Sequence, residues 1–107
     1  MGQVKFVNAL GIDVGTRRIG LARVNSIAKI PEPLGTFMND DTFTAALTRI
    51  IAENDIDAIV VGLPRNMSGV ETPQTNTVRE YVDAVIRKAT ELPIYYCLLY
   101  TSDAADE

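Results

Sequence analysis

An α/β fold built around one mixed sheet is predicted for this chain of 107 residues by two features. Short apolar runs alternate with two segments of helical periodicity, and the first two apolar runs are separated only by a tight turn. That order predicts antiparallel hairpin strands first, followed by parallel strands that are joined by crossover helices. The length allows one domain with one hydrophobic core.

The strands of the hairpin part are expected from three short segments. Residues 9–14 (ALGIDV) form an apolar run, and residues 18–23 (RIGLAR) continue it as a second strand after a Gly-Thr turn. Residues 25–33 are expected to form a loop. Residues 34–38 are then expected to form a short third strand, whose entry is fixed by the two prolines before it.

The parallel part is expected from two amphipathic helices and two further strands. The first helix should begin after Asp40 or Asp41 as its N-cap and end near Asn54. Residues 57–62 (DAIVVG) contain a run of β-branched residues that is bounded by a glycine, which is typical of a buried parallel strand. A loop over 63–71 should lead to a helix with Thr72 as its N-cap and Pro73 as its first residue, and a last strand should begin at 92–96.

Composition excludes several classes of site. One cysteine and no histidine leave no disulfide within the chain, no zinc site of the usual type and no histidine-dependent triad. Any catalysis must therefore use carboxylates, amines, hydroxyls or a hard metal. No apolar run approaches the roughly 20 residues of a membrane helix, so we expect no membrane contact and a cytoplasmic location. The sequence does not indicate an oligomeric state.

Charge is distributed unevenly along the chain, whose formal net charge is −4. The first 30 residues contain five basic residues and one acid, Asp13. This sector is compatible with a phosphate-bearing ligand and equally compatible with an uneven solvated surface.

Asp13 is the acid that needs an explanation, because it lies within a segment that is expected to be a buried strand. A buried carboxylate is costly unless it is paired. The sequence allows two kinds of partner for this carboxylate: the guanidinium of Arg17 or Arg18, in an ion pair, or a hard divalent cation. Ligands of open α/β sheets gather at the carboxyl ends of strands, where we also expect the loops at 15–18 and 64–71.

Two longer motifs carry a family resemblance. GIDVGTRRIGLA (11–22) and VVGLPRNMSGVETPQTNTVREY (60–81) resemble the YqgF/RuvX family, whose members have an RNase H-like fold and are described as Holliday junction resolvases or pre-16S rRNA nucleases. The first motif alone is also similar to the phosphate loop of the sugar-kinase and actin superfamily. The second motif distinguishes the two, and the kinase-type fold needs two such domains.

The resemblance implies a metal-dependent endonuclease that matures the 5′ end of pre-16S rRNA, with nucleic acid and ribosomal precursor particles as partners. The alternatives are a Holliday junction resolvase acting on DNA and a catalytically silent nucleic-acid-binding module. By position, Asp13 would be the catalytic residue and the ligand of Mg²⁺ or Mn²⁺. The residues that would bind substrate are Gly15, Thr16, Arg17, Arg18, Arg65 and Asn66.

Each of these assignments has a simpler alternative. Gly15 would serve a close backbone approach or only a tight turn. Arg65 and Asn66 would equally fit an exposed loop. Glu71 fits the start of a helix better than a metal ligand.

The resemblance ends at residue 96. The family continues there with an Asp-Glu-Arg-Leu-Thr-Thr-like segment, whereas this chain reads CLLYTSDAADE, which resembles a translated sequencing-library adapter. We therefore expect residues 1–96 to be the N-terminal part of the nuclease domain, incomplete at its C-terminus, and residues 97–107 to be a non-native tail. Without that tail, eleven acids stand against ten bases. Because two-metal sites share several carboxylates, the chain is expected to have weak activity or none.

Overall fold

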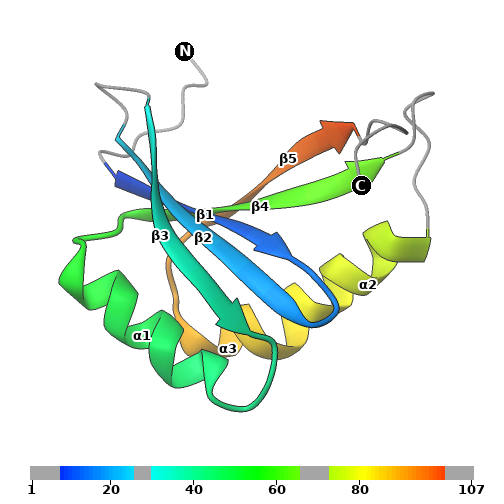
Figure 1. Cartoon of the computed structure of the whole chain (residues 1–107), viewed down its shortest axis with the longest axis horizontal. Helices are drawn as coiled ribbons and strands as arrows, with labels where there is room; N and C mark the ends of the chain where they lie inside the picture. Colours follow the sequence, from blue (N-terminus) through cyan, green and yellow to red (C-terminus); the bar gives the residue numbers. More distant parts are fainter. Residues whose placement is uncertain (1–7, 26–29, 66–72, 101–107) are drawn as a thin grey trace.

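The computed structural model describes residues 8–25, 30–65 and 73–100. Within these ranges, five strands form one sheet in the order β3-β2-β1-β4-β5 (Figure 1). Their bounds are β1 Asn8–Val14, β2 Arg18–Asn25, β3 Pro31–Met38, β4 Ala58–Arg65 and β5 Ile94–Tyr100. Strands β1, β2 and β3 pair antiparallel, and β4 pairs parallel with both β1 and β5. The predicted mixed sheet is confirmed.

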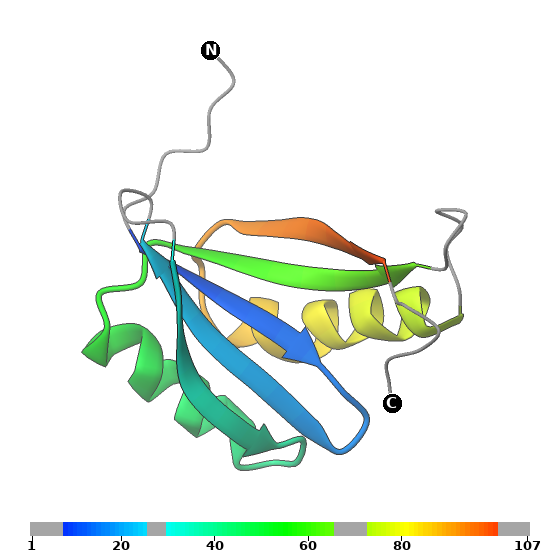
Figure 2. The same ribbon diagram turned by 45° about the horizontal axis from the view of Figure 1, so that its top comes forward.

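The helices of the described ranges all lie on one face of this sheet (Figures 1 and 2). They are α1 (Phe43–Glu53), α2 (Pro73–Tyr81) and α3 (Arg87–Ala89), with one π-helical turn, η1 (Val82–Ile86), between the last two. Each links parallel strands, so its apolar stripe packs against the same side of the sheet. The π-helical turn was not predicted, because the apolar spacing of this segment also fits an ordinary α-helix.

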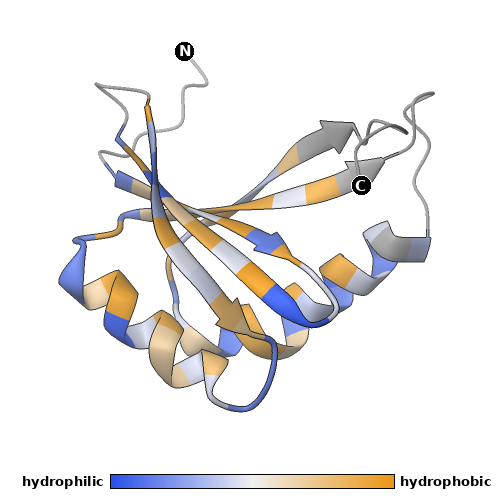
Figure 3. Cartoon of the chain, viewed as in Figure 1, coloured by the Kyte–Doolittle hydropathy of each residue, from blue (hydrophilic) through white to orange (hydrophobic). Residues whose placement is uncertain are grey.

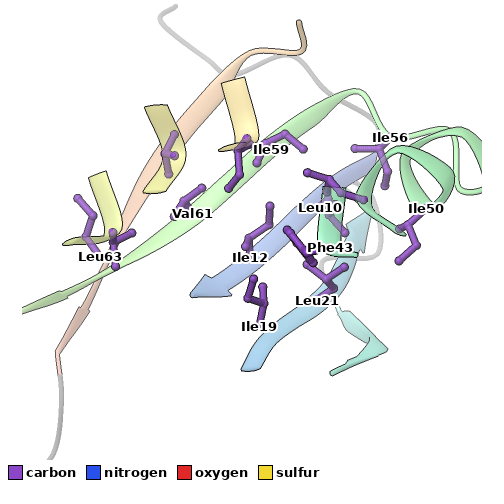
Figure 4. Packing of buried hydrophobic residues seen from close by; sticks show 14 residues of the cluster. Leu10, Ile12, Ile19, Leu21, Phe43, Ile50, Ile56, Ile59, Val61 and Leu63 are labelled. Carbon is purple, nitrogen blue, oxygen red and sulfur yellow. The ribbon is translucent and has the colours of Figure 1, made fainter. Parts of the chain in front are cut away.

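The hydrophobic core lies between the helices and that face. Leu10 and Ile12 of β1 point into it beside Ile59 and Val61 of β4, and Phe43 of α1 packs against them (Figure 4). These side chains are at most 2% exposed. Burying a side chain of this size contributes about 1.5–3 kcal/mol, so these side chains stabilise the fold substantially.

Several boundaries differ from the sequence-based expectation. β3 begins at Pro31 rather than Leu34, which an edge strand tolerates because one side of its backbone needs no partner. β4 continues to Arg65, and β5 continues to Tyr100, because each extends by pairing with the other. The first four residues of the expected tail thus lie in a strand. That residues 97–107 are non-native stays a prediction.

The expected N-cap of α1 is wrong. Thr42 occupies that position and makes no side-chain cap bond. Asp40 instead accepts hydrogen bonds from the backbone N–H of Thr42 at 2.9 Å and from its Oγ1 at 2.5 Å. Both bonds hold the pKa of Asp40 below its usual value, the one from the hydroxyl more strongly. The predicted N-cap Thr72 lies outside the described residues, and α2 begins at Pro73 as predicted.

In the part of the chain that the structure describes, no helix is long and apolar enough to cross a membrane.

Candidate functional site

Asp13 is exposed, so the expectation that it is buried is wrong. Side chains alternate between the two faces of a strand, and Leu10 and Ile12 take the core side of β1. Asp13 therefore belongs to the helix-free face, where water solvates its carboxylate and no burial cost arises. The apolar run hid this difference, because the sequence does not show that helices cover only one face.

The helix-free face is hollowed beside Asp13. The hollow has a volume of about 480 Å³, and residues of all five strands of the sheet line it. Its floor is made largely of small residues, which keep the surface low; among those lining it are Gly11, Gly20, Ala22, Val60, Gly62 and Cys97. In the strands that carry these residues, strongly hydrophobic positions alternate with paler ones (Figure 3). Small residues recur at alternate positions of β1, β2 and β4, and this pattern would have predicted a shallow surface here. The sequence-based expectations did not include it.

The turn between β1 and β2 follows Asp13 directly. Gly15 donates its backbone N–H to the carbonyl oxygen of Arg18 at 2.9 Å, which closes the turn. A Cβ added to Gly15 would stand 2.5 Å from that oxygen, closer than real Cβ contacts. Glycine is therefore required here by close packing of the turn on itself, which supports the tight-turn interpretation of this residue.

The turn presents three exposed polar side chains, those of Thr16, Arg17 and Arg18. Within the described ranges, neither guanidinium pairs with a carboxylate, and Asp13 has no ion pair or hydrogen bond. The ion pair between Asp13 and Arg17 or Arg18 that the sequence left open is thus not formed in the described structure. The carboxylate and both guanidinium groups are available to a ligand.

The charge of this corner is mixed. Asp40 and Asp41 follow the end of β3 and are exposed, and the connection from β3 to α1 is hydrophilic (Figure 3). Arg23, another base of the first 30 residues, pairs with Glu32 and contributes no free charge. The positive charge of this corner therefore comes from Arg17 and Arg18 rather than from a broad basic patch.

The second loop is only partly placed. Arg65 ends β4, where its backbone pairs with Tyr100. Ile12 pairs with Val61, so Gly62 lies level with Asp13, and Arg65 is three residues farther along the strand, about 10 Å. Asn66 and Glu71 lie outside the described residues. The structure thus brings Asp13 together with the turn at 15–18, and places the Arg65 backbone at the same end of the sheet.

The described residues do not fit a complete metal centre. No group of three or more carboxylate, cysteine or histidine residues converges anywhere in ranges 8–25, 30–65 and 73–100. Asp13 is a single carboxylate, whereas a two-metal hydrolase site needs several protein ligands.

Sequence reasoning also missed Asn39, the residue after β3. Its side-chain Nδ2 donates to the carbonyl oxygen of Gly15 at 2.8 Å, and its backbone N–H donates to the carbonyl oxygen of Arg17 at 2.9 Å. An asparagine after a strand carries no sequence signal for such a contact, because the partner lies 24 residues away.

Comparisons with known proteins agree with this geometry. The family model described as "RuvX: Holliday junction resolvase" matches residues 7–105. Two curated relatives named "Putative pre-16S rRNA nuclease" come from Rickettsia canadensis and Koribacter versatilis. They are 39% and 40% identical over 88 residues, which cover 80% of this chain and 56% and 57% of theirs. This chain therefore spans little more than half the length of these relatives.

The sheet is similar to that of Thermus thermophilus RuvC. A RuvC structure in complex with a Holliday junction substrate superposes with a TM-score of 0.61 at 14% identity, over 86% of this chain and 66% of that one. A second RuvC structure gives a TM-score of 0.56 at 16% identity, over 85% and 63%. The likeness confirms the RNase H-like fold that the sequence motifs implied. The chain belongs to the RuvX family.

Proposed function

We propose that this protein handles nucleic acid through the turn at residues 15–18, as part of a phosphodiester hydrolase that matures the 5′ end of pre-16S rRNA. The observation that carries the proposal is that Arg17 and Arg18 are exposed on the turn that follows the exposed Asp13. The names of the curated relatives support the reaction class. A cytoplasmic location, with ribosomal precursor particles as partners, belongs to the same proposal.

The arginines fit the role of phosphate contacts. A guanidinium offers a planar set of donors that matches two phosphate oxygens, and it keeps its charge at every physiological pH. Thr16 adds a hydroxyl on the same turn, and Gly15 keeps the turn compact. Arg65 and Asn66 would add contacts from the second loop. These groups would fix a phosphodiester at the corner occupied by Asp13.

Chemistry at the phosphodiester needs more than this chain shows. In the proposed enzyme, Mg²⁺ or Mn²⁺ bound by Asp13 would supply charge stabilisation at the scissile phosphate. One carboxylate does not make that site. We therefore propose that the 107-residue chain binds substrate and cleaves weakly or not at all, and that the remaining carboxylates belong to a fuller form of the domain.

Binding to a radiolabelled RNA that spans the 5′ end of 16S rRNA tests the proposal. The logarithm of the association constant should fall linearly with the logarithm of salt concentration. Arg17→Ala and Arg18→Ala should each weaken binding and reduce that slope by roughly one phosphate contact. Lys88→Ala is the matched control, because α3 leads into the start of β5 at the opposite end of the sheet. Equal binding by all four proteins would contradict the proposal.

A DNA junction is the second candidate substrate, and the description of the matching family model favours it. A four-way DNA junction and the pre-16S RNA, compared at one salt concentration, separate the two. Tighter RNA binding that is lost when 2′-hydroxyls are removed supports rRNA maturation, because only RNA carries that group. Tighter junction binding supports the resolvase. Binding without cleavage in any fuller form of the domain would identify a silent binding module.

A further inference from the structure

We propose that Asn39 is a positioning residue for nucleic-acid binding, which acts by holding the turn at residues 15–18 in the conformation that presents Arg17 and Arg18. This inference rests on the proposed function of that turn. It concerns a residue outside both sequence motifs, on a different segment of the chain.

Asn39 makes two bonds to one turn. Its Nδ2 reaches the carbonyl oxygen of Gly15 at 2.8 Å, and its backbone N–H reaches the carbonyl oxygen of Arg17 at 2.9 Å. The side-chain bond is partly buried. The turn's own bond, from Gly15 N–H to Arg18, completes the set. Two of these three bonds to turn residues thus come from Asn39.

The position of Asn39 explains why it can brace the turn. Arg18 pairs with Met38 across β2 and β3, so the next residue of the chain arrives beside the turn. Both views of the fold show the β1–β2 turn and the β3–α1 connection side by side (Figures 1 and 2). Thr42 and Asp40 then fix the start of α1 immediately after Asn39. The turn is thereby anchored to a helix.

Anchoring matters because long arginine side chains lose rotational freedom when they bind. A backbone that already holds its binding conformation removes one ordering cost from association. A four-residue turn closed by a single hydrogen bond would sample other conformations. The bonds from Asn39 therefore favour one presentation of both guanidinium groups, although Asn39 itself touches no phosphate.

The test is a double-mutant cycle on binding of the pre-16S RNA. Asn39→Ala keeps the backbone bond and removes the side-chain bond, and it should weaken binding roughly three- to tenfold, as expected for one lost hydrogen bond. In an Arg17→Ala/Arg18→Ala background, Asn39→Ala should have almost no further effect, because its target is gone. Hydrogen exchange of the Gly15 amide should accelerate in Asn39→Ala.

Asn54→Ala is the matched control. Asn54 is also partly buried, and its Nδ2 also donates to a backbone carbonyl, that of Ile50 at 2.9 Å, at the end of α1. It should lower stability by a similar amount and leave RNA binding unchanged. Should Asn39→Ala fail to fold, Asn39→Ser replaces it, because a serine hydroxyl is one bond shorter than the amide nitrogen.

The outcomes separate this inference from the function beneath it. If the double arginine variant binds like the wild type, the proposed function fails. If that variant binds weakly while Asn39→Ala binds like Asn54→Ala, only the role of Asn39 is overturned. Equal fold losses for Asn39→Ala in both backgrounds would also overturn it, because they would show an effect that does not pass through the arginines.

Discussion

The backbone N–H of Gly15 donates to the carbonyl oxygen of Arg18 at 2.9 Å, and a Cβ on Gly15 would lie 2.5 Å from that same oxygen. The contact that closes the turn thus leaves no room for a side chain at residue 15. Because the obstacle is backbone rather than a flexible side chain, the turn itself must move to accept one.

Gly15→Ala should therefore open the turn. We expect a loss of about 1–3 kcal/mol in the free energy of unfolding, the range for overpacked sites, and weaker RNA binding. Urea denaturation and filter binding measure the two effects. Gly11→Ala is the control for stability, since its Cβ would meet the carbonyl oxygen of Ala22 at 3.6 Å, an ordinary contact. Equal stability losses for the two variants would show that the turn tolerates a side chain.

Asp13→Asn should leave stability almost unchanged. The side chain is exposed and, within the described residues, unpaired, so the free energy of unfolding should change by no more than about 0.5 kcal/mol. RNA binding without added metal should not weaken, because a negative charge beside the phosphates is removed. A large loss of stability in urea denaturation would instead indicate that Asp13 forms an ion pair in solution.

Removing divalent metal gives a second measurement on the same residue. Any residual cleavage by the wild-type chain should disappear with EDTA and in Asp13→Asn, while RNA binding persists in both. Strong Mg²⁺-dependent cleavage by this chain, lost in Asp13→Asn, would contradict the proposal that its metal site is incomplete.

The sequence predicted the succession of strands and helices along the chain, the mixed sheet and the place of Asp13 at a strand end, because hydrophobic periodicity and glycine turns are local signals. It did not predict that Asp13 lies on the face of β1 that is exposed to solvent, because the covering of a sheet face depends on how helices distant in sequence pack. The contact of Asn39 with Gly15 and the length of β5 were not predicted for the same reason. Pairing partners 24 or more residues apart leave no local pattern.

Thr42→Val should raise the pKa of Asp40. The Oγ1 hydrogen bond is the main cause that lowers this pKa, and valine removes it while the backbone bond remains. The pKa of this carboxyl group is lower in the folded state than in the unfolded state, where it is near 3.8, so the carboxylate stabilises the fold above that unfolded pKa. This contribution is lost as the pH falls through the pKa of the folded state. NMR titration of the Asp40 carboxyl carbon measures the shift. An unchanged titration in Thr42→Val would contradict the hydrogen bond between the Thr42 hydroxyl and Asp40.

Tyr81 should titrate above the usual pKa of a tyrosine. Burial is the main cause that raises this pKa, and the negative charge of Asp40 adds to it. Because the folded pKa is raised, the neutral phenol stabilises the fold below about pH 10, and the contribution is lost as the pH rises through the folded value. Asp40→Asn should lower the pKa of Tyr81, as read from its ring NMR signals. Asp83→Asn is the control, since Asp83 instead pairs with Arg87.

A chain that ends at Tyr96 should be less stable than one that ends at Tyr100. Cys97–Tyr100 pair with Gly62–Arg65, so the shorter chain loses four of the seven paired positions between β4 and β5. With each ladder hydrogen bond contributing about 0.5–1.5 kcal/mol, the free energy of unfolding should fall by roughly 1–4 kcal/mol. Urea denaturation of the two chains and of the full 107 residues measures this. Equal stability of the two shortened chains would show that residues 97–100 add nothing to β5 in solution.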